Sequence, residues 1–566
     1  MLLSNLDLLA TASGGVARLR ELILTLAVQG KLVPQDPADE PAGELLTKIR
    51  AEKDRLIAEG KIKRDKPLAA IAEEEKPFAL PVGWEWVRLG ALTELITSGS
   101  RDWAEHYSDS GPIFVRMGNL SRGSYRLRMD HVQHVRPPKN GEGSRTSLAA
   151  EDLLLSITGD VGMLGLIPPG FGEAYINQHT CLIRWVRCTR TEFLPVQLLS
   201  GFVQQQFNSP QRGIKNSFRL TDVSGILLAL PPLAEQSRIV TRVEELMRLC
   251  DALEAKGRLE AAQHAQLVST LLGALTASAT PDELADHWQR VAQHFDLLAG
   301  RPEAIDALEQ TLLQLAVRGL LVPQDPQDEP ASVLLQRIRA EKDRLIAAGQ
   351  IKRDKPLPPI TDEEKPFELP VGWAWVRFPD LCAIAGGATP SKANPTFWAG
   401  DIPWVSPKDM KVPQIRDAQD HISGMAIQGS LSLVPSGSLL MVVRGMILAH
   451  SFPIAETLVP VTINQDMKAA TPYLADVLPF LLLVATGMKP EILALVERST
   501  HGTCKLESQK IFGMLFPLPP LAEQSRIVTR VTALRRLCFE LRQRLADAQA
   551  TQSHLAQALV DSTSSV

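Results

Sequence analysis

The sequence predicts an α+β protein with a pseudo-twofold internal repeat, in which two compact, strand-rich domains are separated by long, antiparallel, coiled-coil-like helices. Three observations support this prediction. Two blocks of sequence each occur twice, the segments between them are rich in glycine, proline and short apolar runs, and the segments after them have the apolar spacing of coiled-coil helices.

The repeated blocks enclose a different insert in each half of the chain. Lys-Leu-Val-Pro-Gln-Asp-Pro at residues 31–37 has a close copy at residues 320–326, and the sequence from Leu-Pro-Pro-Leu-Ala-Glu-Gln to Val is identical at residues 230–243 and 518–531. The inserts are nearly equal in length but share little sequence. This pattern indicates two similar frames that carry two different heads, and not a solenoid of many short repeats. The alternative is a duplicated domain whose loops have diverged in sequence, but such divergence does not explain why the blocks on either side of the inserts are nearly identical.

The blocks divide the chain into alternating helical regions and heads. The inserts contain short apolar stretches bounded by glycine and proline, which are typical of strands and turns in a compact α+β domain. We expect helical regions at residues 1–80, 231–369 and 519–566, and head domains at residues 81–230 and 370–518.

A long helix is expected after each Pro-Pro-Leu-Ala-Glu-Gln block. Proline suits the first turn, and Glu235 or Glu523 complements the positive end of the helix dipole. The apolar residues then recur at alternating spacings of four and three, which form an a/d seam. We expect the two seams to pack on each other in antiparallel orientation. The seam residues are Ile239, Val243, Leu246, Cys250 and Leu253 in the first helix, and Ile527, Val531, Leu534, Cys538, Leu541 and Leu545 in the second.

A charged helix is expected before each insert, at about residues 42–58 and 331–347. It ends at a glycine and is followed by a basic segment, Lys-Ile-Lys-Arg-Asp-Lys-Pro at residues 61–67, with a copy at residues 350–356. Two interpretations of this segment stay open at this point. It contacts a DNA backbone, or it is a solvated linker.

Charge is distributed unevenly along the chain. The net charge of −4 gives no overall attraction to nucleic acid. One stretch of the first insert is nevertheless basic, and it suits a limited contact with phosphate groups unless it is simply a solvated loop. Its basic residues are Arg116, Arg122, Arg126, Arg128, Arg136, Lys139 and Arg145, opposed only by Asp130 and Glu142.

The cysteines and apolar runs predict a cytoplasmic protein. The six cysteines include no CxxC pair and no cluster with zinc-ligand spacing, so we expect reduced thiols and no metal. No signal peptide is apparent, and the longest apolar runs are too short to cross a bilayer.

Further motifs accompany the repeats. Gly-Trp-x-Trp-Val-Arg opens each insert, at residues 83–88 and 372–377. Ile-Asn-Gln follows at a similar distance from the start of each insert, at residues 176–178 and 463–465. These motifs occur twice in the same order. Because of them, the sequence resembles the specificity subunit of type I restriction-modification systems over essentially the whole chain. Within the second insert, Gly-Gly-Ala-Thr-Pro-Ser at residues 386–391 looks like the start of a target-recognition domain. The first insert has Ser-Gly-Ser-Arg-Asp-Trp at residues 98–103 instead, so the two heads should read different half-sites.

The resemblance implies a non-catalytic subunit that reads a bipartite sequence in double-stranded DNA, one half with each head. The helical regions would set the distance between the half-sites and dock two methyltransferase subunits, and restriction subunits would join through these. S-adenosylmethionine, ATP and magnesium would bind to the partner subunits, and no cofactor is expected in this chain. The sequence has no GxxxxGK[ST] phosphate loop, which agrees with this division of labour.

Candidate DNA-contacting residues follow from the chemistry of base readout. Arginine and lysine suit guanine, asparagine and glutamine suit adenine, and carboxylates suit cytosine. For each candidate, the alternative is a surface charge or a structural hydrogen bond, and Asn177 and Asn464 are expected to be structural. The candidates are Arg101, Arg116, Asn119, Arg122, Lys215, Asn216 and Arg219 in the first head, and Thr389, Ser391, Lys392, Lys408, Asp409, Lys411, Arg444 and Lys505 in the second.

Two other classes of function compete with this interpretation. The first is a helical scaffold whose heads bind peptides. The second is a fused methyltransferase or nuclease, for which Asn-Pro-Thr-Phe at residues 394–397 is the nearest motif. Thr396 departs from the Asn-Pro-Pro-Phe motif of adenine methyltransferases. The sequence also shows no glycine-rich turn after a strand that would hold their cofactor. We therefore expect residues 394–397 to form a loop of the recognition domain.

Overall fold

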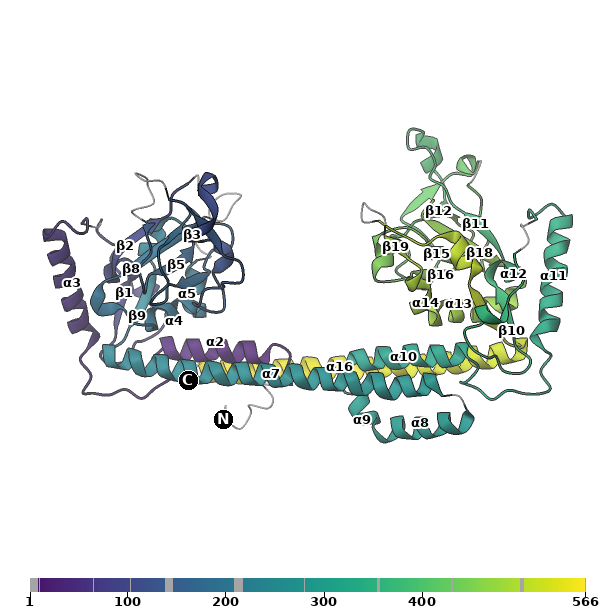
Figure 1. Cartoon of the computed structure of the whole chain (residues 1–566), viewed down its shortest axis with the longest axis horizontal. Helices are drawn as coiled ribbons and strands as arrows, with labels where there is room; N and C mark the ends of the chain where they lie inside the picture. The colour runs from purple at the N-terminus through teal and green to yellow at the C-terminus, as the bar shows by residue number, and fades with distance from the viewer. Residues whose placement is uncertain are drawn as a thin grey trace. The chain divides into compact units, whose positions relative to one another are not determined.

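The computed structural model forms two compact units (Figure 1). It describes residues 9–564 apart from 10, 65, 102, 138–145, 208–216, 279, 354–356, 429–430 and 499–502. Unit 1 comprises residues 1–260 and 549–566, and unit 2 comprises residues 261–548. Each unit therefore contains one head, the N-terminal part of one long helix and the C-terminal end of the other.

The head of unit 1 contains a four-stranded and a three-stranded sheet. The four-stranded sheet is antiparallel and has the order β2-β8-β5-β6, and the three-stranded sheet has the order β4-β3-β7 with β3 parallel to β7. The strands are β2 (Thr93–Ser98), β3 (Tyr107–Val115), β4 (Gln133–Val135), β5 (Leu153–Ser156), β6 (Leu164–Leu166), β7 (Ala174–Ile176) and β8 (Thr180–Trp185). Short helices follow at α4 (Phe193–Leu199), α5 (Gly201–Gln206) and α6 (Leu220–Ser224).

The head of unit 2 repeats this topology although its sequence is different. Its larger sheet has the order β11-β18-β15-β16-β13, which is the same arrangement with one added edge strand, and its smaller sheet has the order β14-β12-β17. β12 is parallel to β17, as β3 is to β7. The strands are β11 (Cys382–Gly386), β12 (Ile402–Val405), β13 (Gln414–Ile415), β14 (Asp420–Ile422), β15 (Leu439–Val442), β16 (Ile454–Thr457), β17 (Thr462–Ile463) and β18 (Met467–Pro472). The helices α13 (Leu478–Gly487), α14 (Lys489–Ala494) and α15 (Ser508–Gly513) follow.

A two-stranded antiparallel ribbon joins the two ends of each head. In unit 1, β1 (Glu85–Arg88) pairs with β9 (Leu227–Leu230), and in unit 2, β10 (Ala374–Arg377) pairs with β21 (Leu515–Leu518). The chain thus enters and leaves each head at one place, directly before a long helix. This arrangement explains how the inserts differ while the flanking blocks stay nearly identical.

The helices expected from the sequence are present. The long helices are α7 (Leu233–Ala277) and α16 (Leu521–Ser564), and the charged helices before the heads are α3 (Ala42–Ala58) and α11 (Ala331–Ala347). An opening helix precedes each charged helix, namely α2 (Gly15–Val28) and α10 (Pro302–Val317). Unit 2 also contains α8 (Pro281–Gln293) and α9 (Phe295–Leu298). No helix in the described part of the chain is both long and apolar enough to cross a membrane.

The expectation that the two seams pack on each other is wrong. Ile239, Val243 and Cys250 are buried in one core with α2 and the head of unit 1, and Leu246 lies at the edge of this core. Leu253 is half-buried and belongs to none of these clusters. The opening helices have apolar faces of their own, and these cover the seams within each unit.

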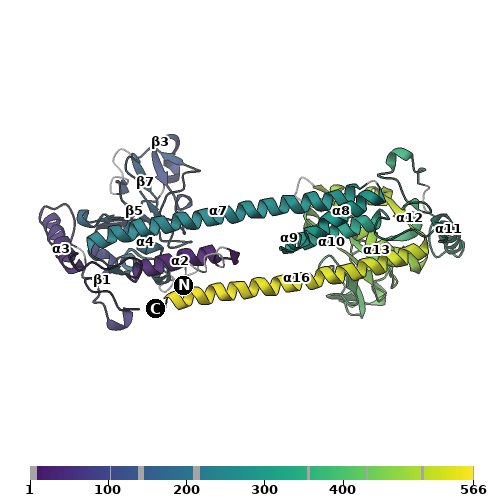
Figure 2. The ribbon, with the colours of Figure 1, turned by 90° about the horizontal axis from the view of Figure 1, so that it is seen from below.

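The seam of α16 is covered in the same way within unit 2 (Figure 2). Ile527 and Val531 enter the core of the head, whereas the later seam residues pack on Ile305 and Leu312 of α10. These later residues are Leu534, Cys538, Leu541 and Leu545.

Each opening helix also lies between parts of both long helices. In unit 1, Arg20 of α2 forms ion pairs with Asp251 at 2.6 Å and Glu254 at 2.9 Å in α7, while Arg18 donates a hydrogen bond to the Ser553 carbonyl of α16 at 2.9 Å. In unit 2, Glu309 of α10 pairs with Arg535 of α16 at 2.7 Å. Another face of α10 shares a core with the C-terminal end of α7, which includes Leu272 and Leu275.

A buried glutamate joins the head of unit 1 to α7, at a site that we call the joint. Glu235 is 1% exposed; its Oε2 accepts a hydrogen bond from Trp84 Nε1 at 2.9 Å, and its Oε1 accepts one from Gln35 Nε2 at 2.8 Å. Burial raises the pKa of this carboxyl, and the two hydrogen bonds oppose the rise. Gly30 also contributes, because its φ is +68° and a Cβ there would lie 2.5 Å from Pro81 Cγ.

Unit 2 contains the same joint. Glu523 is also 1% exposed and accepts hydrogen bonds from Trp373 at 2.9 Å and Gln324 at 3.1 Å. Gly319 has a φ of +74°, and a Cβ there would lie 2.6 Å from Pro370 Cγ. The glutamine of Val-Pro-Gln-Asp-Pro, the tryptophan of the Gly-Trp motif and the glutamate of Pro-Pro-Leu-Ala-Glu-Gln therefore meet at one place in each unit.

We expect Glu235→Gln to lower the free energy of unfolding of unit 1 by about 1–3 kcal/mol, because one accepting oxygen becomes an amide donor that faces another donor in a buried site. Glu523→Gln should have the same effect on unit 2. Thermal unfolding combined with hydrogen exchange at residues 81–90 and 370–379 would measure both. Glu74→Gln, at an exposed glutamate, is the control, and equal behaviour of Glu235→Gln and this control would contradict the role of the joint.

Candidate nucleic-acid interface

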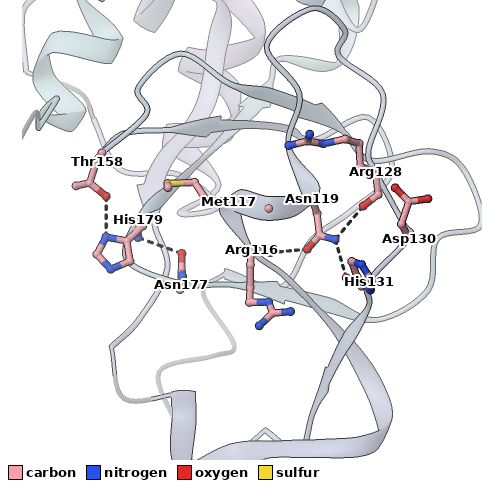
Figure 3. Close-up of a pocket in the computed structure, with 11 residues that line it drawn as sticks. Arg116, Met117, Asn119, Arg128, Asp130, His131, Thr158, Asn177 and His179 are labelled. Carbon is pink, nitrogen blue, oxygen red and sulfur yellow. Dashed lines mark hydrogen bonds between the residues drawn. The ribbon is translucent and has the colours of Figure 1, made fainter. Parts of the chain in front are cut away.

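A basic cavity of about 1050 Å³ opens on the head of unit 1 (Figure 3). Arg116 and the turn after β3 form one side of it, and Arg128 comes from the loop between β3 and β4. Asp130 is its acidic residue. Its other lining residues include Met117, Asn119, His131, Thr158, Asn177 and His179.

Asn119 holds the turn that carries Arg116. Its Oδ1 accepts a hydrogen bond from the Arg116 backbone at 3.0 Å, and its Nδ2 donates to the carbonyls of Arg128 at 2.9 Å and His131 at 3.1 Å (Figure 3). The residue is 5% exposed. Each polar atom of its amide thus has a partner inside the head, which gives Asn119 a structural role, and its contact with DNA stays a prediction.

Asp409 has the same structural position in the second head. Its Oδ2 accepts hydrogen bonds from the backbone and the hydroxyl of Ser406, both at 2.9 Å, and its Oδ1 accepts one from the Gln419 backbone at 2.9 Å. Asp409 caps the turn after β12 as Asn119 caps the turn after β3. Asp409 is half-buried, and its carboxylate keeps acceptor capacity beyond these three hydrogen bonds, so base reading by Asp409 stays a prediction.

A second pair of equivalent turns completes each site. Asn177 Oδ1 accepts a hydrogen bond from the His179 backbone at 3.1 Å, and Asn464 Oδ1 accepts one from the Asp466 backbone at 3.0 Å. These contacts agree with the structural role expected for both asparagines. In the first head, the turn orients His179, whose Nδ1 lies 2.6 Å from Thr158 Oγ1 (Figure 3).

Glycine lets the neighbouring strand approach this turn closely in both heads. A Cβ at Gly99 would lie 2.0 Å from the Ile176 carbonyl oxygen, and a Cβ at Gly387 would lie 2.1 Å from that of Ile463. The two glycines therefore share one packing requirement, although the surrounding sequences differ.

The second head has a smaller basic groove, of about 330 Å³, at the corresponding turn. Arg444 and Lys505 lie side by side in an isolated β-bridge, and Lys468 and Gln465 also line the groove. Lys505 forms an ion pair with Glu507 at 3.0 Å. Two of the predicted residues are thus brought together, and Lys468 is an addition that the sequence did not suggest.

The remaining predicted residues lie outside these two hollows. Arg122 forms an ion pair with Asp160 and donates a hydrogen bond to the Val161 carbonyl, and Thr389 donates one to Gln465. Exposed side chains with no ion pair among the described residues are Arg101, Arg219, Lys392, Lys408 and Lys411, and Ser391 is exposed as well. Lys215 and Asn216, like Lys139 and Arg145 of the basic stretch, lie outside the described residues.

Sequence reasoning missed several residues of the first cavity. Arg128 was counted in the basic stretch but not chosen as a contact, and His131, Thr158 and His179 had no motif to mark them. They come from three separate loops. Within the described residues, no group of three or more histidine, cysteine, aspartate or glutamate side chains is placed to hold a metal ion.

Comparison with known proteins identifies the family. A family model described as "Type I restriction modification DNA specificity domain" matches residues 81–264 and 370–548, which together make up more than half of the chain. The chain belongs to this family. The resemblance found in the sequence is confirmed.

Full-length relatives agree with this assignment. The specificity subunit of the type I restriction enzyme EcoAI from Escherichia coli is 35% identical to this chain, over 97% of this chain and 93% of the relative. That of EcoEI, from the same species, is 34% identical over the same shares. A chain solved in work on assembly and conformational transition of the type I R-M system has a TM-score of 0.50 and 20% identity, and covers 86% of this chain and 99% of its own length. This last match shows the fold alone.

We expect Asn119→Ala to destabilise the first head by about 1–3 kcal/mol, because it leaves one buried backbone donor and two carbonyls without their partner. Asp409→Ala should have a similar effect on the second head. Arg101→Ala and Lys408→Ala, at exposed side chains, are the matched controls. Hydrogen exchange at residues 116–131 and 406–419 would localise each effect, and unchanged exchange in both variants would contradict the structural role.

Proposed function

We propose that this chain is the non-catalytic DNA-reading subunit of a cytoplasmic type I restriction-modification complex, in which each head reads one half of a split target in double-stranded DNA. The observation that supports this most is that two heads of one topology, attached through identical joints, differ in the side chains at equivalent positions. Arg116 corresponds to Ser406, and His179 corresponds to Asp466. One scaffold would thus read two different half-sites.

The chemistry of the two hollows suits this role. Arg116, Arg128 and the histidines offer donors to guanine and to phosphate, and Arg444, Lys468 and Lys505 do so in the second head. The amide of Gln465, which lines the groove of the second head, adds a donor and an acceptor for other base edges, whereas the carboxylate of Asp466 is paired with Arg444 at 3.8 Å. A difference in base preference between the heads follows from these differences.

The chemistry on DNA would reside in partner subunits. In this proposal, two methyltransferase subunits bind the helical regions and methylate adenine at N6, using S-adenosylmethionine. Restriction subunits join through them and use ATP and magnesium. The relatives named above are specificity subunits of type I restriction enzymes, which supports this assignment.

We further propose that α7 and α16 run antiparallel and set the gap between the half-sites. Each long helix has a stretch of seven residues whose side chains are all exposed, residues 254–260 in α7 and residues 546–552 in α16, and within the first stretch Glu254 forms an ion pair with Arg20 at 2.9 Å. Both stretches lie at the boundary between the units. A deletion of residues 246–252 would not serve, because Leu246 and Cys250 pack in the core of unit 1.

Deleting residues 254–260 together with residues 546–552 should shorten the gap in the methylated motif by about three base pairs. Seven helical residues span about 10 Å and nearly preserve the helix phase, and three base pairs of DNA cover the same distance. Both half-sites should be retained. Adenine methylation mapped by long-read sequencing in cells that also express the methyltransferase subunit would show the gap, and an unchanged gap would contradict the spacer role.

Arg116→Ala combined with Arg128→Ala should relax base preference in one half-site and leave the other half-site unchanged, because both arginines belong to one head. Loss of one good arginine contact costs about 1–3 kcal/mol of discrimination. The readout is the methylated motif. Arg126→Ala, in the same basic stretch but outside this cavity, is the control.

A change in both half-sites, or in neither, would argue against base reading by these arginines. The scaffold alternative predicts that partner binding persists and that no split motif appears with any of these chains. The fused-enzyme alternative predicts methyl transfer or cleavage by the purified chain alone.

A further inference from the structure

A turn in the head of unit 2 holds two adjacent apolar side chains in solvent. The turn connects β15 to β16 and contains a short 3₁₀ helix, η11 (Met446–Ala449). Met446 is 61% exposed and Ile447 is 45% exposed. We call these two residues the apolar pair. Single apolar residues are common on protein surfaces, whereas two adjacent ones at the edge of a charged groove call for an explanation.

The backbone that carries the apolar pair is anchored on both sides. Before the pair, the Gly445 backbone donates a hydrogen bond to the Cys504 carbonyl at 3.0 Å. Gly445 has a φ of +137°, which residues with a side chain rarely adopt. After the pair, Leu448 and Phe452 are buried in the core of the head. The turn therefore presents its two exposed side chains from a fixed position.

The apolar pair adjoins the basic groove of the second head. Arg444, two residues before Met446, lines this groove and forms an isolated β-bridge with Lys505. Lys468 lines the groove as well. These cations attract phosphate groups, so DNA that enters the groove would come close to the apolar pair.

The first head has a polar residue at the equivalent place. β5 pairs with β8 as β15 pairs with β18, and Thr158 forms an isolated β-bridge where Arg444 does in the second head. Asp160 then corresponds to Met446, and it forms an ion pair with Arg122. The topology that the heads share is thus built without an exposed apolar pair. The pair belongs to the features in which the two heads differ.

An apolar side chain suits one particular group on the edges of the bases. In the major groove, the C5-methyl group of thymine is the apolar feature, and apolar side chains recognise it by contact. The cations of the groove offer donors for guanine and for phosphate. The apolar pair adds the chemistry that suits thymine, because contact between the two removes apolar surface from water.

We propose that Met446 and Ile447 read the methyl group of a thymine in the half-site of the second head. This inference rests on the proposed function, which supplies the DNA target. The pair contacts the methyl group, while the neighbouring cations hold the DNA. Other bases lack this methyl group and are therefore bound less tightly at the same position.

The test uses the full chain in complex with the methyltransferase subunit, and DNA duplexes that carry the mapped target. Each thymine of both half-sites is replaced in turn by uracil, which lacks only the methyl group and keeps the base pair. Binding is measured for the wild-type chain and for Met446→Ala with Ile447→Ala. The matched control is Met425→Ala with Leu433→Ala, which removes two side chains of the same head that are 60% and 48% exposed. Thermal unfolding shows that each chain is folded.

We expect uracil at one thymine of one half-site to weaken binding by the wild-type chain and by the control about three- to tenfold, since burial of one methyl group is lost. The same uracil should not weaken binding by the Met446→Ala, Ile447→Ala chain, because that chain no longer contacts the methyl group. The effects of uracil in the other half-site should be the same for all three chains.

Two results would overturn the inference. The first is wild-type binding that tolerates uracil at every thymine, and the second is an equal effect of uracil on the wild-type and the Met446→Ala, Ile447→Ala chains. The second result with lower overall affinity would show that the pair contacts DNA without reading a methyl group, as in insertion between base pairs. The proposed function fails separately: a wild-type complex that methylates no split motif contradicts both, whereas a split motif with tolerant thymines contradicts this inference alone.

Discussion

The arrangement of each unit depends on one buried carboxylate in the first turn of a long helix. Glu235 and Glu523 each tie the helix to the tryptophan that opens the head and to the glutamine of the preceding loop. A carboxylate in a site that excludes water raises the free energy of the fold unless its oxygens are hydrogen-bonded, and here both oxygens are. Nearby, Arg238 pairs with Asp39 at 2.6 Å and fixes the loop to the same helix. The head is therefore attached at a fixed place and angle to the helix that follows it.

This attachment separates the part of the chain that must stay the same from the part that is free to change. Within each head, the strand order and the two capped turns persist, while the residues around the hollows differ. Asn119 and Asp409 show how this is achieved, because either an amide or a carboxylate accepts the backbone hydrogen bond that closes the turn. Under the proposed function, the side chains that read bases vary on loops that a constant framework holds in position.

Much of the fold was predictable from the sequence because its signals are local or repeated. The heptad spacing predicted α7 and α16, and the duplicated blocks predicted two heads of one kind. The partner of each seam was not predictable in this way, since Ile239 is buried in one core with residues of α2, more than two hundred residues away along the chain. The joint was missed for the same reason: Gln35, Trp84 and Glu235 are prominent in separate motifs, and only the fold brings them together. Among the candidate residues, charge pointed to Arg116 and Arg444, which line the two hollows, but it could not reveal that Asp409 caps a turn.

The central claim is that two different heads on identical joints read two different half-sites at a fixed separation. It is tested most directly by mapping adenine methylation with long-read sequencing in cells that express this chain with its methyltransferase subunit, against cells that lack this chain. We expect one new motif, made of two unlike halves with a constant gap. A complex shown to assemble that yields no new motif, or an undivided one, would contradict it.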